Sequence, residues 1–166
     1  MKNNKKATLI FGGACIILIL DFITKWLIAT KMILGQSFVL IPKILSLTYV
    51  QNIGAGFSIL QGQQVLLSII GLVVVGFIFY YYKQIPKIKY VQWSVMLILG
   101  GTLGNMLERM FNNYVTDFIH IGIWPKFNIA DSCVVIGGIG LAYYFWKEEK
   151  KEKQKKTKEV RHHHKN

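Results

Sequence analysis

Asp117 and Asp131 are the two residues of this sequence best suited to carry chemistry. They flank a connection that contains Gly122 and Pro125 and need not be extended, so the two carboxyl groups can meet. Two carboxyl groups within a few Å cannot both ionise easily, and such a pair holds one proton near neutral pH. The pair is therefore expected to activate a water molecule and to protonate a leaving amine.

Few other acidic residues accompany the apolar part of the chain. The sequence has eight acidic residues, and four of them lie in a polar C-terminal segment: Glu148, Glu149, Glu152 and Glu159. Besides the pair, only Asp21 and Glu108 lie outside that segment. Because an ionisable group at membrane depth is costly, each of these acids is a functional candidate whose partner must be found.

The composition is that of a membrane protein. The 166 residues are 52% hydrophobic and only 17% charged, with a mean hydropathy of +0.37, which is too apolar for an ordinary soluble domain. Four apolar stretches, at about 7–28, 64–82, 91–110 and 129–146, approach the roughly 20 residues that cross a hydrocarbon core. We therefore expect a mostly α-helical membrane protein, with four transmembrane helices in a single domain over 1–146.

The basic residues predict the orientation of the chain in the membrane. The net charge of +12 would suit a nucleic acid, but the bases cluster at the ends of the apolar stretches, so no nucleic-acid partner is expected. They include Lys2, Lys5, Lys6, Lys83, Lys87, Lys89 and the run that begins at Lys147. The positive-inside rule makes both termini and the basic tail at 147–166 cytoplasmic. The segments 29–63 and 111–128 must then lie outside.

The external segment at 29–63 has a different pattern. From Ser37 to Val50 it is β-branched and aliphatic, broken by Pro42, which favours short strands over a helix. The glycines that follow, in 51–58, permit tight turns and a close approach to another chain. We expect a small extracytoplasmic β-rich element between the first two helices, which could bind an extended peptide by edge pairing. A plain loop is the alternative.

Polar residues share helix faces in two of the apolar stretches. Asp21 and Lys25 are four residues apart with the acid first, the favourable order for an ion pair. Asn105, Glu108 and Arg109 lie on one face of the third stretch, after small residues that let helices approach closely. Buried charges of this kind need hydrogen-bond partners, and Asn105 is a candidate partner for Glu108 and Arg109.

Structural alternatives exist for each of these features. Asp21 and Lys25 could form an interfacial ion pair that fixes helix depth beside Trp26. Asp131 could serve a helix cap, because Asn128 and Asp131 have the spacing of an N-cap residue and an acid in the first turn. Asp117 could be a solvated loop acid. The start of the chain could be a secretory signal, although its apolar run continues well past Cys15.

Taken together, these features resemble the lipoprotein signal peptidase family, the bacterial type II signal peptidases. The similarity covers about residues 10–146, in the order typical of the family. The matching segments are Asp21 to Lys25, Asn52-Ile53-Gly54-Ala55 with Phe57, Gly104-Asn105 with Arg109, Val115-Thr116-Asp117-Phe118 and Phe127-Asn128-Ile129-Ala130-Asp131. Two departures are Glu108, where an Asp is expected, and a short interval between Asp117 and Asp131.

The resemblance implies an intramembrane aspartic endopeptidase of the bacterial cytoplasmic membrane, with Asp117 and Asp131 as its catalytic dyad near the outer face. Such enzymes remove the signal peptide from diacylglyceryl-modified prolipoproteins by cutting N-terminal to the lipidated Cys. The implied partners are these substrates, membrane lipid and globomycin-type inhibitors. The implied supporting or substrate-binding residues are Asn52, Gly54, Asn105, Arg109, Asn128, Asp21, Lys25 and Glu108.

Other functions predict other patterns. We expect no cofactor and no metal, because the three adjacent His at 162–164 in a basic tail make at best a weak, incidental site and a magnesium-dependent lipid transferase would need more carboxylates on one helix. The main alternative is a non-enzymatic protein such as a proton-coupled transporter that uses Asp21 or Glu108. Transport predicts polar residues throughout the bilayer depth, whereas these gather near one face.

Overall fold

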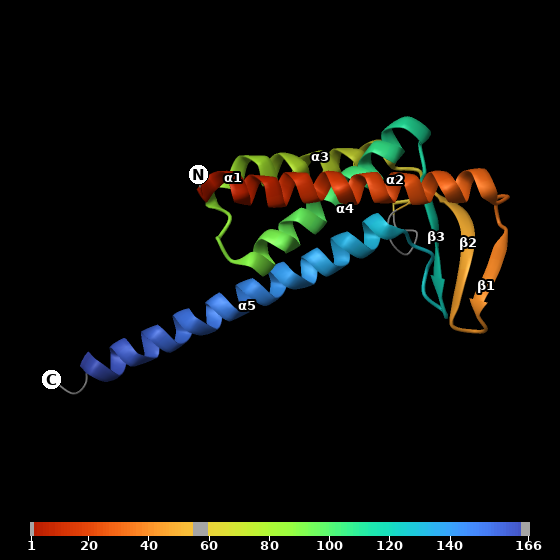
Figure 1. Cartoon of the computed structure of the whole chain (residues 1–166). Coiled ribbons are helices and arrows are strands. Elements are labelled where there is room, and N and C mark those ends of the chain that lie inside the picture. The colour runs from red at the N-terminus through yellow and green to blue at the C-terminus, as the bar shows by residue number, and fades with distance from the viewer. Residues whose placement is uncertain (1, 55–59, 164–166) are drawn as a thin grey trace.

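The computed structural model describes residues 2–54 and 60–163. Its long helices lie beside one another, and a small sheet projects sideways from one end of them (Figure 1). The first helical rod comprises α1 (Lys2–Ala7), a π-helical turn η1 (Thr8–Gly12) and α2 (Gly13–Lys31). The others are α3 (Gln64–Tyr81) with the 3-10 turn η3 (Tyr82–Gln84), α4 (Lys89–Asn112) and α5 (Ile129–His163).

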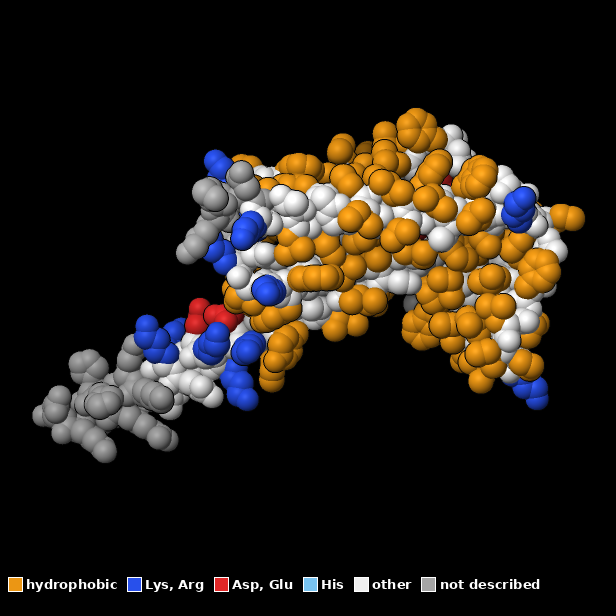
Figure 2. Space-filling model, in the orientation of Figure 1, with side chains coloured by type: hydrophobic (Ala, Val, Ile, Leu, Met, Phe, Trp, Pro, Cys, Tyr) orange, Lys and Arg blue, Asp and Glu red, His pale blue; other side chains and the backbone are white. Residues whose placement is uncertain are grey.

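The helices expose apolar side chains on their outer faces. Phe22 is 68% exposed, and Val73 and Ile139 are exposed to a similar extent, which would be unfavourable in water (Figure 2). Within the described residues, three helical segments are long and apolar enough to cross a membrane: Lys5–Lys31, Gln64–Gln84 and Ile129–Thr157. These exposed apolar faces and candidate spans are those of a membrane protein.

Helix α4 is the most buried of the helices and packs against α2, α3 and α5. Its glycines allow this close packing, as the sequence predicted. A Cβ atom added at Gly100 would lie 2.8 Å from Cβ of Ile17, and one added at Gly101 would clash with the carbonyl of Ala130. The more polar α4, expected as a span at 91–110, is not among the three segments selected by length and composition.

The sheet contains one strand more than the sequence predicted. The predicted β-rich element is confirmed by β1 (Ser37–Ile41) and β2 (Leu45–Asn52), which are antiparallel. A third strand, β3 (Val115–Ile121), comes from the 111–128 segment, which was predicted to be a loop, and pairs antiparallel with β2 in the order β1-β2-β3. The prediction for 111–128 was wrong because β2 offers a free edge that only the tertiary structure brings to this segment.

The last helix continues beyond the apolar stretch predicted at 129–146. Lys and Glu favour helix in the residues that follow, and ion pairs join Lys151 to Glu148 at 2.6 Å and Lys153 to Glu149 at 2.5 Å. The basic tail therefore extends α5 in a single helix and projects beyond the other helices (Figure 1).

Lys6 joins the first helix to the connection between α3 and α4, at the end of the bundle opposite the sheet. Its side chain is only 5% exposed. Its Nζ donates hydrogen bonds to the carbonyls of Tyr82 at 2.7 Å, Ile85 at 3.1 Å and Lys83 at 3.3 Å, and lies over the Tyr82 ring. The Tyr82 carbonyl also accepts from the N–H of Ile85 at 3.3 Å. All three carbonyls lie in the segment between α3 and α4, so one ammonium group holds this connection.

We expect Lys6→Met to lower the free energy of unfolding by about 2 kcal/mol, the usual value of a hydrogen bond to a charged group. The apolar replacement removes the ammonium donor from the carbonyls of Tyr82, Lys83 and Ile85. Thermal unfolding in detergent measures the change. Lys5→Met is the matched control, because Lys5 is exposed and should change stability by less than about 0.5 kcal/mol. Equal losses of stability from the two substitutions would contradict this role of Lys6 in joining the first helix to the connection between α3 and α4.

Candidate active site

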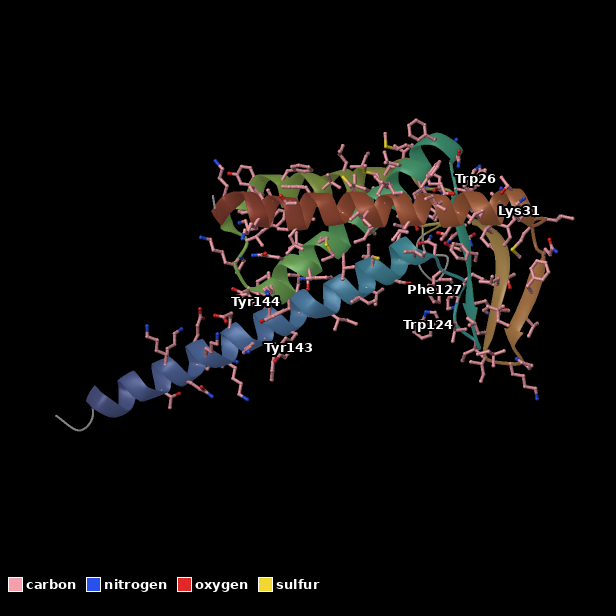
Figure 3. The ribbon with its side chains drawn as sticks, viewed as in Figure 1. Trp26, Lys31, Trp124, Phe127, Tyr143 and Tyr144 are labelled. Carbon is pink, nitrogen blue, oxygen red and sulfur yellow. The ribbon has the colours of Figure 1, made fainter. Side chains whose placement is uncertain are left out.

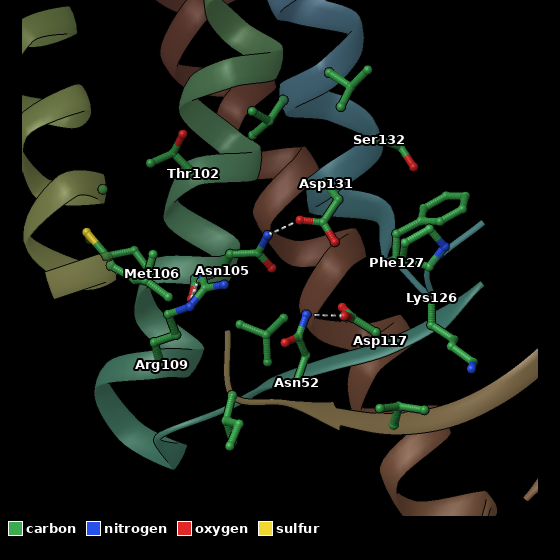
Figure 4. Close-up of a pocket in the computed structure, with 18 of the residues that line it drawn as sticks. Asn52, Thr102, Asn105, Met106, Arg109, Asp117, Lys126, Phe127, Asp131 and Ser132 are labelled. Carbon is green, nitrogen blue, oxygen red and sulfur yellow. Dashed lines mark hydrogen bonds between the residues drawn. The ribbon is translucent and has the colours of Figure 1, made fainter. Parts of the chain in front are cut away.

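The two aspartates predicted to act together lie at the junction of the sheet and the helices. Asp117 is in the middle of β3, opposite Val50 of β2, and Asp131 is in the first turn of α5. Both line one cavity of about 1040 Å³, and Figure 4 shows their carboxyl groups side by side within it. The pair predicted from the sequence is therefore brought together by the fold.

Asp117 is buried, with 1% exposure, and is not the solvated loop acid that was the structural alternative. The amide groups of Asn52 and Asn128 each donate a hydrogen bond of 2.8 Å to its carboxylate, one to each oxygen. Burial first, and then the neighbouring Asp131 charge, raise the pKa of Asp117 to about 7 against the lowering effect of the two amides. Asp117 can therefore hold a proton at neutral pH.

Asp131 forms a reciprocal cap with Asn128 at the start of α5. The backbone N–H of Asp131 donates to Oδ1 of Asn128 at 2.9 Å, and the backbone N–H of Asn128 donates to Oδ2 of Asp131 at 3.2 Å. The capping interpretation of Asp131 is thus correct, and it is compatible with a chemical role for the same carboxyl group. The cap fixes the carboxylate, while Oδ1 accepts a 2.7 Å hydrogen bond from the amide of Asn105 (Figure 4).

Asn128 connects the two acids. Its backbone N–H and its side-chain oxygen Oδ1 both bond to Asp131, and its side-chain nitrogen Nδ2 donates to Asp117. The side chain is fully buried. One residue therefore sets the position of both carboxyl groups, and its amide orientation is defined because its oxygen accepts and its nitrogen donates.

Lys25 lies at the centre of a buried ionic cluster behind the acids. Its Nζ is 2.7 Å from Oδ2 of Asp21 and 3.0 Å from Oε2 of Glu108, and it donates a 2.8 Å hydrogen bond to Oδ1 of Asn105. The last contact, together with a 3.1 Å hydrogen bond that Nδ2 of Asn128 donates to the same oxygen, orients the Asn105 amide so that its nitrogen faces Asp131. The expected ion pair of Asp21 and Lys25 forms, and both side chains are buried within the protein.

The two acids of this cluster also hold backbone groups near the site. Oδ1 of Asp21 accepts from the N–H of Ala130 at 2.9 Å, and Oε2 of Glu108 accepts from the N–H of Thr116 at 3.1 Å. Ala130 directly precedes Asp131, and Thr116 directly precedes Asp117. Sequence reasoning did not find these two backbone contacts. A Cβ added at Gly104 would lie 2.6 Å from Asp21 Oδ2, so the absence of a side chain at Gly104 makes room for this carboxylate.

Glu108 has different partners from those expected. The sequence suggested that it belongs with Arg109 and that Asn105 supplies its hydrogen bond. In the structure its carboxylate pairs with Lys25 and Thr116. Helical neighbours point in different directions, so Glu108 faces α2 while Arg109 faces the cavity.

Arg109 holds the turn after β2. Its Nη2 donates to the carbonyl of Gly54 at 3.0 Å and its Nη1 to the carbonyl of Asn105 at 3.5 Å. The N–H of Gly54 in turn donates to Oδ1 of Asn52 at 2.8 Å, which directs the other end of that amide to Asp117. Ala55 and Phe57, which the family resemblance also includes, lie outside the described residues.

The remaining cavity wall is largely apolar. Leu67, Ile70 and Val74 of α3 lie on one side, and Val134 and Val135 of α5 on the other. The loop before α5 contributes Trp124 and Phe127 at the sheet end (Figure 3), together with Lys126 (Figure 4). Among the described residues, no group of three or more His, Cys, Asp or Glu is placed to bind a metal. The cavity is suited to an apolar chain whose polar backbone reaches the acids.

Comparisons with known proteins agree with this arrangement. A model of the family described as signal peptidase (SPase) II matches residues 13–147. The chain is 43% identical to the lipoprotein signal peptidase of Halothermothrix orenii over 134 residues, which are 81% of this chain and 92% of that protein. It is 41% identical to the lipoprotein signal peptidase of Streptococcus pyogenes serotype M5, over 78% of this chain and 88% of that protein.

Two solved structures are also similar. Both are described as bacterial membrane enzymes studied by the in meso method, and both are 34% identical to this chain. One has a TM-score of 0.79 and is aligned over 84% of this chain and 88% of its own. The other has a TM-score of 0.74, over 81% and 90%.

Proposed function

Because the chain belongs to the signal peptidase II family, it removes signal peptides from lipoprotein precursors, and we propose that Asp117 and Asp131 are the catalytic dyad of this aspartic endopeptidase. The observation that carries the proposal is the convergence of the two buried carboxyl groups on one cavity, with Asn128 bonded to both. The alternative of a proton-coupled transporter has no support from the relatives.

The dyad acts through one shared proton. The ionised carboxylate takes a proton from a water molecule, and the resulting hydroxide attacks the carbonyl carbon of the scissile peptide. The partner that holds the proton stabilises the carbonyl oxygen and then supplies the proton that the leaving amine requires, and the raised pKa of Asp117 favours Asp117 in this role. The amides of Asn52, Asn105 and Asn128 keep the carboxyl groups in place throughout.

The supporting residues divide into two groups by what they contact. Asn52, Gly54 and Arg109 form the wall next to β2, where the peptide backbone of a substrate would lie. The second group is Asp21, Lys25 and Glu108. These side chains bond to Asn105 and to the backbone N–H of the residue that precedes each aspartate, and so act on the position of the dyad. The first group is proposed to bind substrate and the second to position the acids.

We assign four transmembrane helices to this bacterial membrane protein, with α4 as the third span. Its central position among the three more apolar segments supports this assignment. The start of α1, the α3–α4 connection and the tail of α5 lie at the end away from the sheet (Figure 1), and they carry Lys5, Lys83, Lys87 and the lysines from Lys147 onward. The positive-inside rule therefore makes that end cytoplasmic. The dyad and the sheet then lie at the outer face, where a precursor arrives after export.

The substrate is proposed to be a precursor whose lipobox Cys already carries diacylglycerol, cut on the N-terminal side of that Cys. The acyl chains would remain among lipids beside α3 and α5, and hold the modified residue at the mouth of the apolar cavity. Globomycin-type cyclic peptides are expected to occupy the same cavity and to compete with the substrate.

The test compares one precursor with and without its diacylglyceryl group, in the same lipid and with the purified protein. We expect cleavage of the lipidated form at the bond before the modified Cys and no measurable cleavage of the other. Addition of globomycin should stop the reaction. Equal cleavage of both precursors would exclude recognition of the lipid, and cleavage of neither would contradict the assignment of substrate.

The raised pKa of Asp117 predicts how the rate depends on pH. The protonated form of this group, needed in the dyad, is lost as the pH rises through about 7. We expect kcat/KM to fall about ten-fold per pH unit above that value. Initial rates with the lipidated precursor between neutral and alkaline pH measure this. A rate that stays constant far into the alkaline range would mean that Asp117 does not supply the proton.

A further inference from the structure

One end of the sheet carries a group of exposed apolar side chains that the proposed function does not explain. They belong to residues 41–44, which join β1 to β2, and to residues 121–124, at the end of β3. We name these two segments together the tip. The N–H of Gly122 donates to the carbonyl of Ile44 at 2.9 Å, so the two segments form one unit. Lys43 is the only charged residue of the tip.

The tip exposes its apolar side chains almost completely. Ile123 is 102% exposed, and the other exposed apolar side chains are Ile44 at 59%, Trp124 at 58%, Ile41 at 47% and Ile121 at 45%. A single exposed apolar residue is ordinary, but a contiguous group of them is typical of a surface that contacts another apolar phase. Between Ile121, Ile123, Trp124 and Phe127 the surface forms a shallow recess.

The tip lies beside the start of α5. Phe127 forms a bridge with Ile119 of β3, with N–H to carbonyl distances of 3.0 Å and 2.8 Å in the two directions. A strand advances about 3.3 Å per residue, so Ile121 is only about 7 Å along β3 from this bridge. Ile129, two residues after Phe127, begins a helical segment long and apolar enough to cross a membrane. The tip is therefore next to the point at which α5 would enter the lipid.

The apolar surface of the tip is continuous with that of α5. Trp124 lies on the side of the sheet that faces α5 (Figure 3). Trp124 and two exposed residues of α5, Val135 and Ile136, line the same cavity. The sheet projects sideways from the helices (Figure 1), and apolar side chains cover it (Figure 2). A sheet that projects in this direction extends over the lipid beside α5.

The backbone of the tip is also suited to surroundings with little water. The N–H groups of Ile44, Gly122 and Trp124 donate to the carbonyls of Ile41, Ile44 and Ile121, at 3.1 Å, 2.9 Å and 2.8 Å. All of these donors and acceptors belong to the tip. Because unpaired backbone groups are costly in lipid, this internal pairing lowers the cost of moving the tip out of water.

We propose that the tip inserts into the lipid leaflet beside the first turn of α5. Ile123 and the neighbouring isoleucines contact the upper part of the acyl chains, and Trp124 lies at the level of the headgroups, where tryptophan is favoured. The long apolar stem of Lys43 lets its ammonium group reach the headgroups or the water.

The tip matters for the proposed function because it belongs to the connection between Asp117 and Asp131. Lipid that holds the tip also keeps Trp124 and Phe127, which line the cavity, at the level of the leaflet that contains the acyl chains of the substrate. This consequence rests on the proposed function. Insertion of the tip does not, and it is measured without any cleavage.

Electron paramagnetic resonance on the full chain in lipid nanodiscs, with a single copy per disc, tests the proposal. A nitroxide label is attached at Ile123→Cys, with Cys15 and Cys133 replaced by Ser. Oxygen concentrates among acyl chains and a nickel chelate stays in water, so the label's collisions with each report its surroundings. We expect oxygen collisions to dominate at 123, as at Ile139→Cys on the exposed face of α5.

Ser37→Cys supplies the reference for water, because Ser37 is exposed at the other end of β1 from the tip. A label at 123 that collides with the chelate as often as the label at 37 would overturn the proposal. Protection from the chelate that occurs only in discs with two copies would also overturn it, since it would indicate contact between copies.

A charged residue in the tip tests what drives insertion. Ile44→Asp, with the label at 123, should lower the ratio of inserted to withdrawn tip by about ten-fold or more, the usual consequence of losing one buried isoleucine. Val39→Asp is the matched control, because Val39 is 65% exposed on β1 but outside the tip, and the collisions of the label should not change. An unchanged label in Ile44→Asp, or equal changes in both variants, would contradict insertion driven by the tip.

Discussion

Asp117→Asn and Asp131→Asn are each expected to lower the turnover of a lipidated precursor by about 10³-fold or more, the upper range for loss of a general acid or base. An amide has nearly the shape of the carboxyl group but cannot exchange a proton with water or with the leaving amine. Neither replacement compensates for the other, because the dyad holds one proton between its members. The measurement is kcat with purified variants in the same lipid.

The control must show that the variants fold. Glu149→Gln, an exposed acid on the same helix as Asp131, should keep full activity. Thermal unfolding of the two Asn variants should remain a single transition, although Asp117→Asn will shift it, since the amides of Asn52 and Asn128 both donate to the native carboxylate. Normal turnover by either folded variant would refute the proposed dyad.

Lys25→Met is expected to have the second largest effect. It leaves Asp21 and Glu108 as buried carboxylates without their cation, which costs about 3–5 kcal/mol of folding free energy. It also removes the shorter of the two hydrogen bonds to Oδ1 of Asn105 and leaves only the 3.1 Å bond from Nδ2 of Asn128, so the amide is held less firmly in its orientation toward Asp131. Chemical or thermal unfolding and cleavage rate together measure the two losses. Lys31→Met, at an exposed lysine of the same helix, is the control.

A variant in which the whole Asp21–Lys25–Glu108 cluster is uncharged separates the effect of Lys25 on stability from its effect on the position of Asn105. In the triple variant Asp21→Asn, Lys25→Met and Glu108→Gln, no buried charge lacks a partner, and an amide oxygen can still accept from Ala130 or Thr116. Most of the lost stability should return, because replacing a whole buried ionic group is far less costly than breaking it. The cleavage rate should stay low with KM nearly unchanged. Recovery of both properties would mean that Lys25 acts on stability alone.

Sequence reasoning found the residues of the site better than it found their contacts. Asn52, Asn105, Asn128 and Arg109 were chosen because they match the family's motifs, and each lies at the cavity or bonded to the acids. Glu108 was attached to the wrong partner, because spacing on one helix cannot reveal a lysine that arrives from another. The capping and catalytic interpretations of Asp131 were treated as rivals, yet the structure uses the same atoms for both.

The sequence was sufficient for everything that depends on local pattern and composition. The apolar lengths of the helices, the strands of 37–50, the glycines at close contacts and the two aspartates are properties of neighbouring residues. Their physical basis is short in range, since hydrophobic periodicity and backbone preference act within a few residues.

The tertiary structure decided which distant groups meet. It placed β3 on the edge of β2, which buried Asp117, and it enclosed Lys25 among Asp21, Glu108 and Asn105. A buried charge binds whichever opposite charge or dipole the packing brings within about 3 Å, and that choice is made by several helices and the sheet at once. The protonation of the dyad follows from the same enclosure, because exclusion of water raises the pKa of Asp117.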